Sequence, residues 1–264
     1  MKWAAETRAA ALPPCVWVWV KESVFWSKSW HIHAGYWAPG LGVFVFNIGA
    51  CLLFFEALRR SPLSVTIPIL AFVPVFAALG GWFTLQEHLL WQQWVAVALV
   101  GLGALFLNTV PDDYRRPLHF LGSLGRETGS LLMIGVALCW AATSVLDKMA
   151  MEHCSPEMHA GVQTLAMGVV LTLWLSIRGR SREMLGVMEY PAAFFGGVAV
   201  AVVALGLQLY ALQILYVGLM EGIKRAFGIV MAIVLGRLLF GEALSSGKIV
   251  AGILMGGGVF LLSQ

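Results

Sequence analysis

Three charged residues stand inside an otherwise apolar stretch, in the run EGIKRAFG at 221–228. Glu221, Lys224 and Arg225 fall within a few helical turns of the start of a segment of membrane length. A charge at such depth costs about 2.5–3.5 kcal/mol on insertion scales, so it normally faces a partner or a wet cavity. Glu221 and Lys224 are spaced to pair on one helical face, which would make them a simple structural ion pair. The alternative is a cationic patch in a central cavity, suited to an anionic or zwitterionic solute.

Other segments carry polar or helix-breaking residues that could line the same cavity. Asn47 lies within one apolar stretch, and Pro68 and Pro74 interrupt the next. Proline removes a backbone donor, and broken helices line the substrate cavities of secondary transporters. A simple kink explains the two prolines equally well, and Asn47 could instead bond a neighbouring helix.

Carboxylates near the ends of apolar stretches have either a structural or a proton-coupling role. Glu56 precedes Arg59–Arg60 and is expected to form an ion pair at a helix end, with proton coupling as the alternative. Glu221 is the second candidate for proton coupling. Asp147 and Lys148 lie near the end of their stretch, so extension of their polar groups to the membrane surface is favoured over a functional role inside the bundle.

The sequence contains no motif that indicates an enzyme. HExxH and GxSxG are absent, so no catalytic residue is predicted, and the missing GxxxxGK[ST] loop argues against an ATP-driven pump. The residues give no reason to expect a cofactor. Glu152, His153 and Cys154 with His159 could hold a metal, but a polar loop between helices explains them equally well. We therefore predict no metal site.

The composition is that of a membrane protein. Hydrophobic residues make up 59% of the chain and charged residues 12%, against roughly a quarter charged in soluble domains. The net charge of +3 is small and gives no indication of a nucleic-acid partner. A spanning helix needs about 20 mostly apolar residues. Eight stretches qualify, at roughly 36–58, 63–85, 90–110, 129–150, 158–177, 190–214, 217–240 and 246–263. We predict an all-α, polytopic bundle embedded in a lipid bilayer, packed tightly through its many glycines and alanines.

The apolar stretches at 63–85 and 90–110 are similar in sequence to those at 217–240 and 246–263. The copies share Ala71-Phe72 with Ala226-Phe227, Gly81 with Gly236, Glu87 with Glu242, and Gly101-x-Gly103 with Gly256-x-Gly258. Internal repeats in an apolar chain are typical of secondary transporters, whose two halves rock about a site near the midplane. The matching glutamates close their helices at equivalent places, so we expect them to share a structural role such as fixing the turn.

The repeats divide the chain into four parts. Residues 1–35 form an irregular N-terminal segment or partial helix, because their apolar run is too short to span. Residues 36–110 hold three helices of a first repeat, and 111–128 form the loop between repeats. Residues 129–264 hold the five helices of the second repeat.

The run SPLSVTIPILAFVPVFAALGGWFTLQE, followed by an apolar segment with GxG, resembles the EamA-type transporters of the drug/metabolite transporter superfamily. The second copy, KRAFGIVMAIVLGRLLFGE, is similar to the corresponding helix of the family's second half, and Ser155-Pro156 to its helix-six-to-seven connection. The resemblance covers about 36–264. It implies two inverted five-helix halves that carry small metabolites or drugs, often outward. The eight stretches would then be helices three to ten, with the first two missing or reduced to the N-terminal segment.

Together these features predict a secondary transporter that moves a small metabolite or drug-like solute by alternating access. We expect a multi-pass protein of the plasma or inner membrane, and export is one of the two possible directions of transport. The alternative is a degenerate or partner-dependent membrane subunit with no transport of its own, because the family's early helices help to line the cavity. The expected partners are the solute and the bilayer, and assembly as a homodimer is left open.

The arginines predict an orientation. Those at 59–60, 115–116, 126 and 178–182 fall on one side if the eight stretches alternate across the membrane. The bias of cations toward the cytoplasm places that side inside. The family's ten-helix pattern, with both ends cytoplasmic, implies the opposite orientation.

Overall fold

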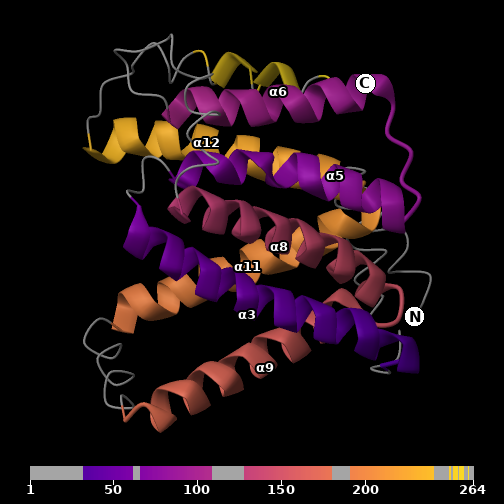
Figure 1. Ribbon diagram of the computed structural model, residues 1–264, viewed down its shortest axis with the longest axis vertical. Helices are drawn as coiled ribbons and strands as arrows, with labels where there is room; N and C mark the ends of the chain where they lie inside the picture. Colours follow the sequence, from indigo (N-terminus) through magenta and orange to yellow (C-terminus); the bar gives the residue numbers. More distant parts are fainter. Residues whose placement is uncertain are drawn as a thin grey trace, which may run out of the picture.

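The computed structural model describes residues 32–61, 66–108, 128–179 and 191–240, with residues 250, 252–254, 256–258 and 261 near the C-terminus. All regular structure in these residues is helical, which confirms the all-α prediction (Figure 1). The predicted N-terminal segment lies almost wholly outside the described residues, as do the loop between repeats and Glu242.

The first half contributes three long helical elements. The short helix η2 (Ala34–Tyr36) leads into α3 (Trp37–Arg60). The next element is broken as the prolines predicted: the 3-10 helix η3 (Ile67–Phe72) passes into α5 (Val73–Thr84). Pro68 and Pro74 each stand in the first two positions of their helix, where a missing N–H leaves no hydrogen bond unmade. The helix α6 (Trp91–Asn108) follows.

The second half contributes α8 (Thr128–Met151), α9 (Pro156–Ile177), α11 (Pro191–Ile214) and α12 (Val217–Phe240). The Ser155 side chain caps α9 by accepting from the backbone N–H of Met158. This cap, with proline in the first turn, fixes the predicted break between α8 and α9.

The helices form one bundle with the α3–α8 pair at its centre. The two helices are antiparallel: Gly129 at the start of α8 contacts Ser61 at the end of α3, while the His33 N–H bonds the His153 carbonyl at the other end. In Figure 1, α9 lies beyond α3, and α5, α12 and α6 lie beyond α8, while α11 crosses behind the pair and contacts α8, α9 and α12. The described C-terminal residues pack on α6, where Gly258 lies against Val100.

Small residues bring the helices close together. Ala50, Ala57, Ala77 and Ala137 have no exposed surface. At the α5–α12 crossing, a Cβ added to Gly218 would stand 2.7 Å from Cα of Ala78. Such close backbone approach is how helices associate in lipid, where apolar burial gives little drive.

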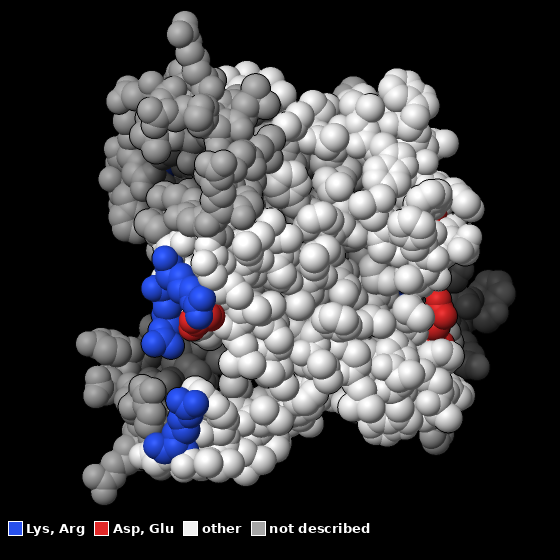
Figure 2. Space-filling view, viewed as in Figure 1, with Lys and Arg blue, Asp and Glu red and all other residues white. Residues whose placement is uncertain are grey.

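The surface is that of a membrane protein. Four helices in the described chain have the length and composition to span a bilayer: Ala34–Arg60, Thr128–Met151, Pro156–Ile177 and Phe194–Ile214. The stretch Ile69–Thr84 is apolar but shorter. The predicted span at 217–240 forms one continuous helix that carries Glu221, Lys224, Arg225 and Arg237, more charge than an ordinary span holds. The face in Figure 2 is uncharged across its middle, with arginines along one edge.

Candidate functional site

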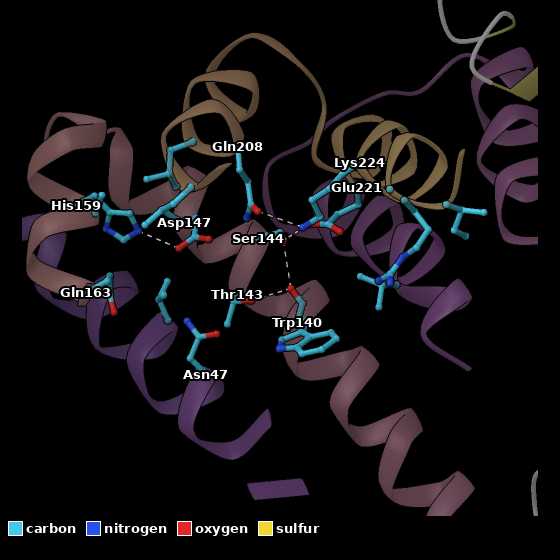
Figure 3. Close-up of a pocket in the computed structure, with 18 residues that line it drawn as sticks. Asn47, Trp140, Thr143, Ser144, Asp147, His159, Gln163, Gln208, Glu221 and Lys224 are labelled. Carbon is cyan, nitrogen blue, oxygen red and sulfur yellow. Dashed lines mark hydrogen bonds and ion pairs between the residues drawn. The ribbon is translucent and has the colours of Figure 1, made fainter. Parts of the chain in front are cut away.

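A cavity of about 490 Å³ opens inside the bundle, lined from both halves of the chain (Figure 3). The first half contributes Val43 and Asn47 from α3 and Val73 from α5. The second half contributes the remaining wall, from α8, α9, α11 and α12. Apolar residues such as Leu205, Leu209 and Ile229 alternate there with polar ones. The volume is in the range of small-molecule sites.

One wall carries the charged residues of α12. Lys224 Nζ lies 2.5 Å from Glu221 Oε1, which is the i, i+3 pair expected from the sequence. Ser144 of α8 donates to the same oxygen at 2.8 Å, so the buried carboxylate is held by two donors from two helices. The Lys224 ammonium also donates to Gln208 of α11 at 3.3 Å. This wall is therefore fixed to the bundle at two points, through Ser144 of α8 and Gln208 of α11.

Arg225 lines the cavity beside this pair. Its Nε is buried and has no hydrogen-bond partner among the described residues. A buried donor without a partner is costly, and native proteins rarely leave one unsatisfied. Arg225 is therefore a residue of this wall whose hydrogen-bonding capacity the described residues do not use up.

The opposite end of the cavity holds a buried histidine that the sequence analysis placed in a loop. His159 Nε2 lies 2.9 Å from Asp147 Oδ1, and His159 Nδ1 lies 3.1 Å from the Tyr36 hydroxyl. The relative exposures of Tyr36, His159 and Asp147 are 1%, 1% and 9%. The expectation that Asp147 reaches the membrane surface is wrong, because a partner on the next helix holds its carboxylate in the interior.

Lys148 does not reach the surface either. Its ammonium donates to Glu87 Oε1 at 2.6 Å and to the Leu215 carbonyl at 2.7 Å. The other Glu87 oxygen accepts the first N–H of α12, from Val217, at 2.9 Å. Glu87 thus joins the α5–α6 turn to α8 and to the start of α12.

The turn that presents Glu87 is specialised. Gln86 has φ of 55°, a left-handed conformation that is unusual for a residue other than glycine. The carboxylate folds back over Gly81, where an added Cβ would lie 2.5 Å from Oε2. The repeat's shared Gly81 and Glu87 therefore act together here, in agreement with the expected structural role.

Polar residues on α8 and α9 complete the lining. The Thr143 hydroxyl donates to the Trp140 carbonyl at 2.8 Å, and Gln163 donates to the Gly40 carbonyl at 2.8 Å. Thr143 and Asp147 are four residues apart, as are His159 and Gln163. This helical spacing is the signal in the sequence that could have placed both pairs on cavity-facing stripes.

The structure places the predicted site residues in different parts of the bundle. Glu221, Lys224, Arg225 and Asn47 all line the cavity. Pro74 is buried in the core and does not line it. Pro68 lies in η3, and its side chain is outside the described part of the structure.

Glu56 lies at the other end of α3, away from the cavity. Its carboxylate is 2.7 Å from Arg60 Nε and 3.6 Å from an Arg59 nitrogen, and all three side chains are at least partly exposed. The ion pair expected at the helix end is therefore present.

The possible metal ligands point in different directions. The His153 ring packs against Gly35, while His159 faces Asp147 and Tyr36. Burial raises the pKa of the Cys154 thiol to about 11, so it stays protonated at neutral pH, and it contacts the Ala150 carbonyl. No group of three histidine, cysteine or acidic residues able to hold a metal occurs within the described ranges.

Among the residues that the structure describes, the charged side chains lining the cavity come from the second half of the chain. Alignment of the copies sets Thr66, Ile69 and Leu70 at the positions of Glu221, Lys224 and Arg225. The three first-repeat residues are buried in the bundle. The polar site is thus a property of the second copy, although both halves enclose it.

Known proteins similar to this chain are transporters. It is 29% identical over 129 residues to a riboflavin transporter of Vibrio cholerae, a match covering 48% of this chain and 37% of that protein. It is 26% identical over 221 residues to an uncharacterized transporter of Methanothermobacter thermautotrophicus, covering 81% of this chain and 60% of that one. The chain thus spans less than two thirds of either relative.

A solved crystal structure shares the fold, with a TM-score of 0.60 and 16% identity over 85% of this chain and 75% of that one. The family model named EamA-like transporter family matches residues 7–109 and 127–264, which include both repeats. With its apolar helices, repeated halves and enclosed cavity, the chain is an integral, multi-pass membrane protein that belongs to the EamA-like transporter family.

Proposed function

We propose that this protein is a secondary transporter of the cell membrane and that the cavity between its two halves is the substrate site. The observation that supports this most directly is the cavity of about 490 Å³ with Arg225 in its wall, a residue whose buried Nε has no partner among the described residues. Both halves contribute to the lining, so a rocking motion between them would open the cavity to either side in turn.

The proposed solute is a small molecule with one anionic group and an apolar or ring-shaped body. Arg225 offers a donor for the anion, and Lys224, already paired with Glu221, adds positive potential beside it. Trp140, Leu205 and Ile229 supply apolar contact for the body. The name of the Vibrio cholerae relative makes riboflavin and its phosphate sensible first compounds.

The test is solute flux in proteoliposomes. The panel contains riboflavin, riboflavin 5′-phosphate, amino acids, nucleosides, sugar phosphates and cationic drugs, with gradients imposed in both directions. For a transported anion, Arg225→Gln should lower the ratio of maximal flux to KM by at least about tenfold, because it removes a charge-assisted hydrogen bond of roughly 1.5–3 kcal/mol. Arg59→Gln, an exposed arginine at a helix end, is the matched control and should leave flux unchanged.

Two results would count against the proposal. Equal flux in the wild type and Arg225→Gln would remove Arg225 from the substrate site. Absence of flux for every compound, with the protein folded, would favour the alternative of a partner-dependent subunit.

A further inference from the structure

We propose that Asp147 and His159 form a proton-binding site that couples solute movement to a proton gradient. The coupling rests on the transport function proposed above, whereas the proton site itself can be tested without a solute. Neither residue was a proton-coupling candidate from the sequence, which pointed to Glu221 and Glu56.

The geometry is that of a buried chain of hydrogen bonds reaching the cavity. The Asp147 carboxylate and the His159 ring are 2.9 Å apart, and both line the cavity. The Tyr36 hydroxyl lies 3.1 Å from the other ring nitrogen and so fixes the orientation of the imidazole. Figure 3 shows Asp147 and His159 toward one end of the cavity, with Glu221 and Lys224 toward the other. A proton held between Asp147 and His159 is therefore next to the space in which the solute would sit.

The type of base distinguishes this site from the other buried carboxylates. Glu221 is paired with Lys224 and Glu87 with Lys148, and a lysine in an ion pair keeps its charge through the physiological range. The ion pair of Asp147 is with His159. Histidine is the side chain whose ordinary pKa lets it gain or lose a proton at physiological pH. Of these three acids, Asp147 is thus the one whose counter-charge can appear and disappear.

The other titratable groups packed around the site are engaged elsewhere. Lys148 of α8 bonds to Glu87, and Lys224 of α12 bonds to Glu221. Glu157 of α9 bonds to Tyr210 of α11. In the α8–α9 turn, Cys154 contacts the Ala150 carbonyl and His153 packs on Gly35. Arg225 remains, with its unpartnered Nε in the same cavity.

The sign of the coupling follows from the charges. With one proton on the Asp147–His159 pair, the pair is a neutral ion pair. Without that proton, it carries one negative charge on the cavity wall and repels an anion bound at Arg225. An anionic solute should therefore bind more tightly to the protonated protein, and by linkage it should raise the affinity for the proton equally. The two would move in the same direction, so a more acidic outside would drive accumulation inside.

The first measurement needs no solute. Nitrogen-15 histidine NMR of the detergent-solubilised protein, with His159→Gln to assign the signal, should show His159 changing protonation across the physiological range. Asp147→Asn should alter the pH dependence of that signal, because the imidazole ring loses its hydrogen-bonded carboxylate. A His159 signal that stays in one protonation state, or that Asp147→Asn leaves unmoved, would overturn the proton site.

The second measurement uses riboflavin 5′-phosphate as an anionic probe and riboflavin as its neutral counterpart, with a pH-sensitive dye inside the proteoliposomes. Flux of the anion should carry protons with it. The KM for the anion should rise on the order of tenfold as the pH is raised and the pair loses its proton, a typical coupling factor. His159→Gln should abolish this pH dependence and Asp147→Asn should alter it, whatever their absolute flux. Glu56→Gln, a carboxylate outside the cavity, should retain it.

The outcomes separate the two proposals. A titrating His159 without flux of any panel compound contradicts the transport proposal and leaves the proton site standing. Flux whose pH dependence survives both variants refutes the coupling, even if the protein is a transporter. Loss of pH dependence in Glu56→Gln alone would assign coupling to the helix-end carboxylate instead.

Discussion

Glu87 is nearly buried, with 5% of its surface exposed, and its two oxygens serve separate tasks. One accepts from Lys148 and the other from the first N–H of α12. Lys148 in turn donates to the Leu215 carbonyl, an end of α11 that would otherwise lack a partner. A single ion pair therefore satisfies polar groups from three elements, and its loss would leave several of them unpaired at once.

Lys148→Met should destabilise the protein by about 3 kcal/mol, because it leaves a buried carboxylate without its counter-charge. Glu87→Gln should cost less, since the amide can still accept from the α12 N–H. The double variant should be more stable than the sum of the two losses predicts, by at least about 1 kcal/mol. Thermal or denaturant unfolding in detergent measures the cycle, and strictly additive losses would show that the pair does not stabilise the fold.

Whether an ion pair could be predicted from the sequence depends on how far apart its two residues lie along the chain. The Glu221–Lys224 and Glu56–Arg60 pairs lie within one helical turn, where helix geometry alone brings the charges together, and both were predicted. The Lys148–Glu87 and Asp147–His159 pairs depend on how different helices cross. No periodicity encodes that crossing, so Asp147 and Lys148 were expected at the membrane surface, and Glu87 was expected to fix its turn without a partner being identified.

At the scale of elements, proline and glycine decide how α5 fits into the bundle. The sequence predicted an interruption from Pro68 and Pro74, and the chain there changes from a 3-10 to an α-helix. The function of the interruption was not predictable. Most residues at 69–78 are buried between other helices, and Val73 rather than Pro74 reaches the cavity. The α5–α12 crossing depends instead on Gly218, which glycine-rich composition alone did not single out.

Gly218→Ala should therefore destabilise the bundle by roughly 1–3 kcal/mol, the usual cost of overpacking, because the new methyl group would overlap the backbone of Ala78. Gly206→Ala on α11 is the matched control, since an added Cβ there meets nothing within 4 Å. By helix propensity alone that control should be neutral or up to about 1 kcal/mol stabilising. Equal unfolding midpoints for the two variants would mean that the α5–α12 contact is looser than described.

At the scale of the whole molecule, the duplicated sequence forms a bundle whose halves differ in chemistry. The repeat was visible in the sequence and explains why residues from both halves enclose one cavity. The assignment of charge to one copy was also visible, since apolar residues replace Lys224 and Arg225 in the first repeat. The position of the polar wall was not visible in the sequence, because it depends on how α8 packs against α12 and α9, which brings Ser144 to Glu221 and Asp147 to His159.

The positions of the charged residues also predict how the whole molecule is oriented in the membrane. Arg59 and Arg60 end α3 and Arg178 follows α9, and Figure 2 shows lysine or arginine side chains along one edge, while Glu152 is exposed in the turn after α8. Cations near short loops prefer the cytoplasm, so we expect the arginine edge to face inward. In a cysteine-free background, Arg178→Cys should react with a membrane-impermeant maleimide only from the cytoplasmic side, and Glu152→Cys only from outside.

The opposite labelling pattern would agree with the ten-helix arrangement implied by the family and would show that the preceding helices, rather than the arginines, set the orientation. Labelling of both cysteines from the same side would contradict the spans themselves, because α9 starts beside residue 152 and ends beside residue 178. Within a helix of 22 residues the chain rises about 33 Å, which is enough to cross the hydrocarbon core once. One experiment therefore tests both the transmembrane path of α9 and the rule that orients it.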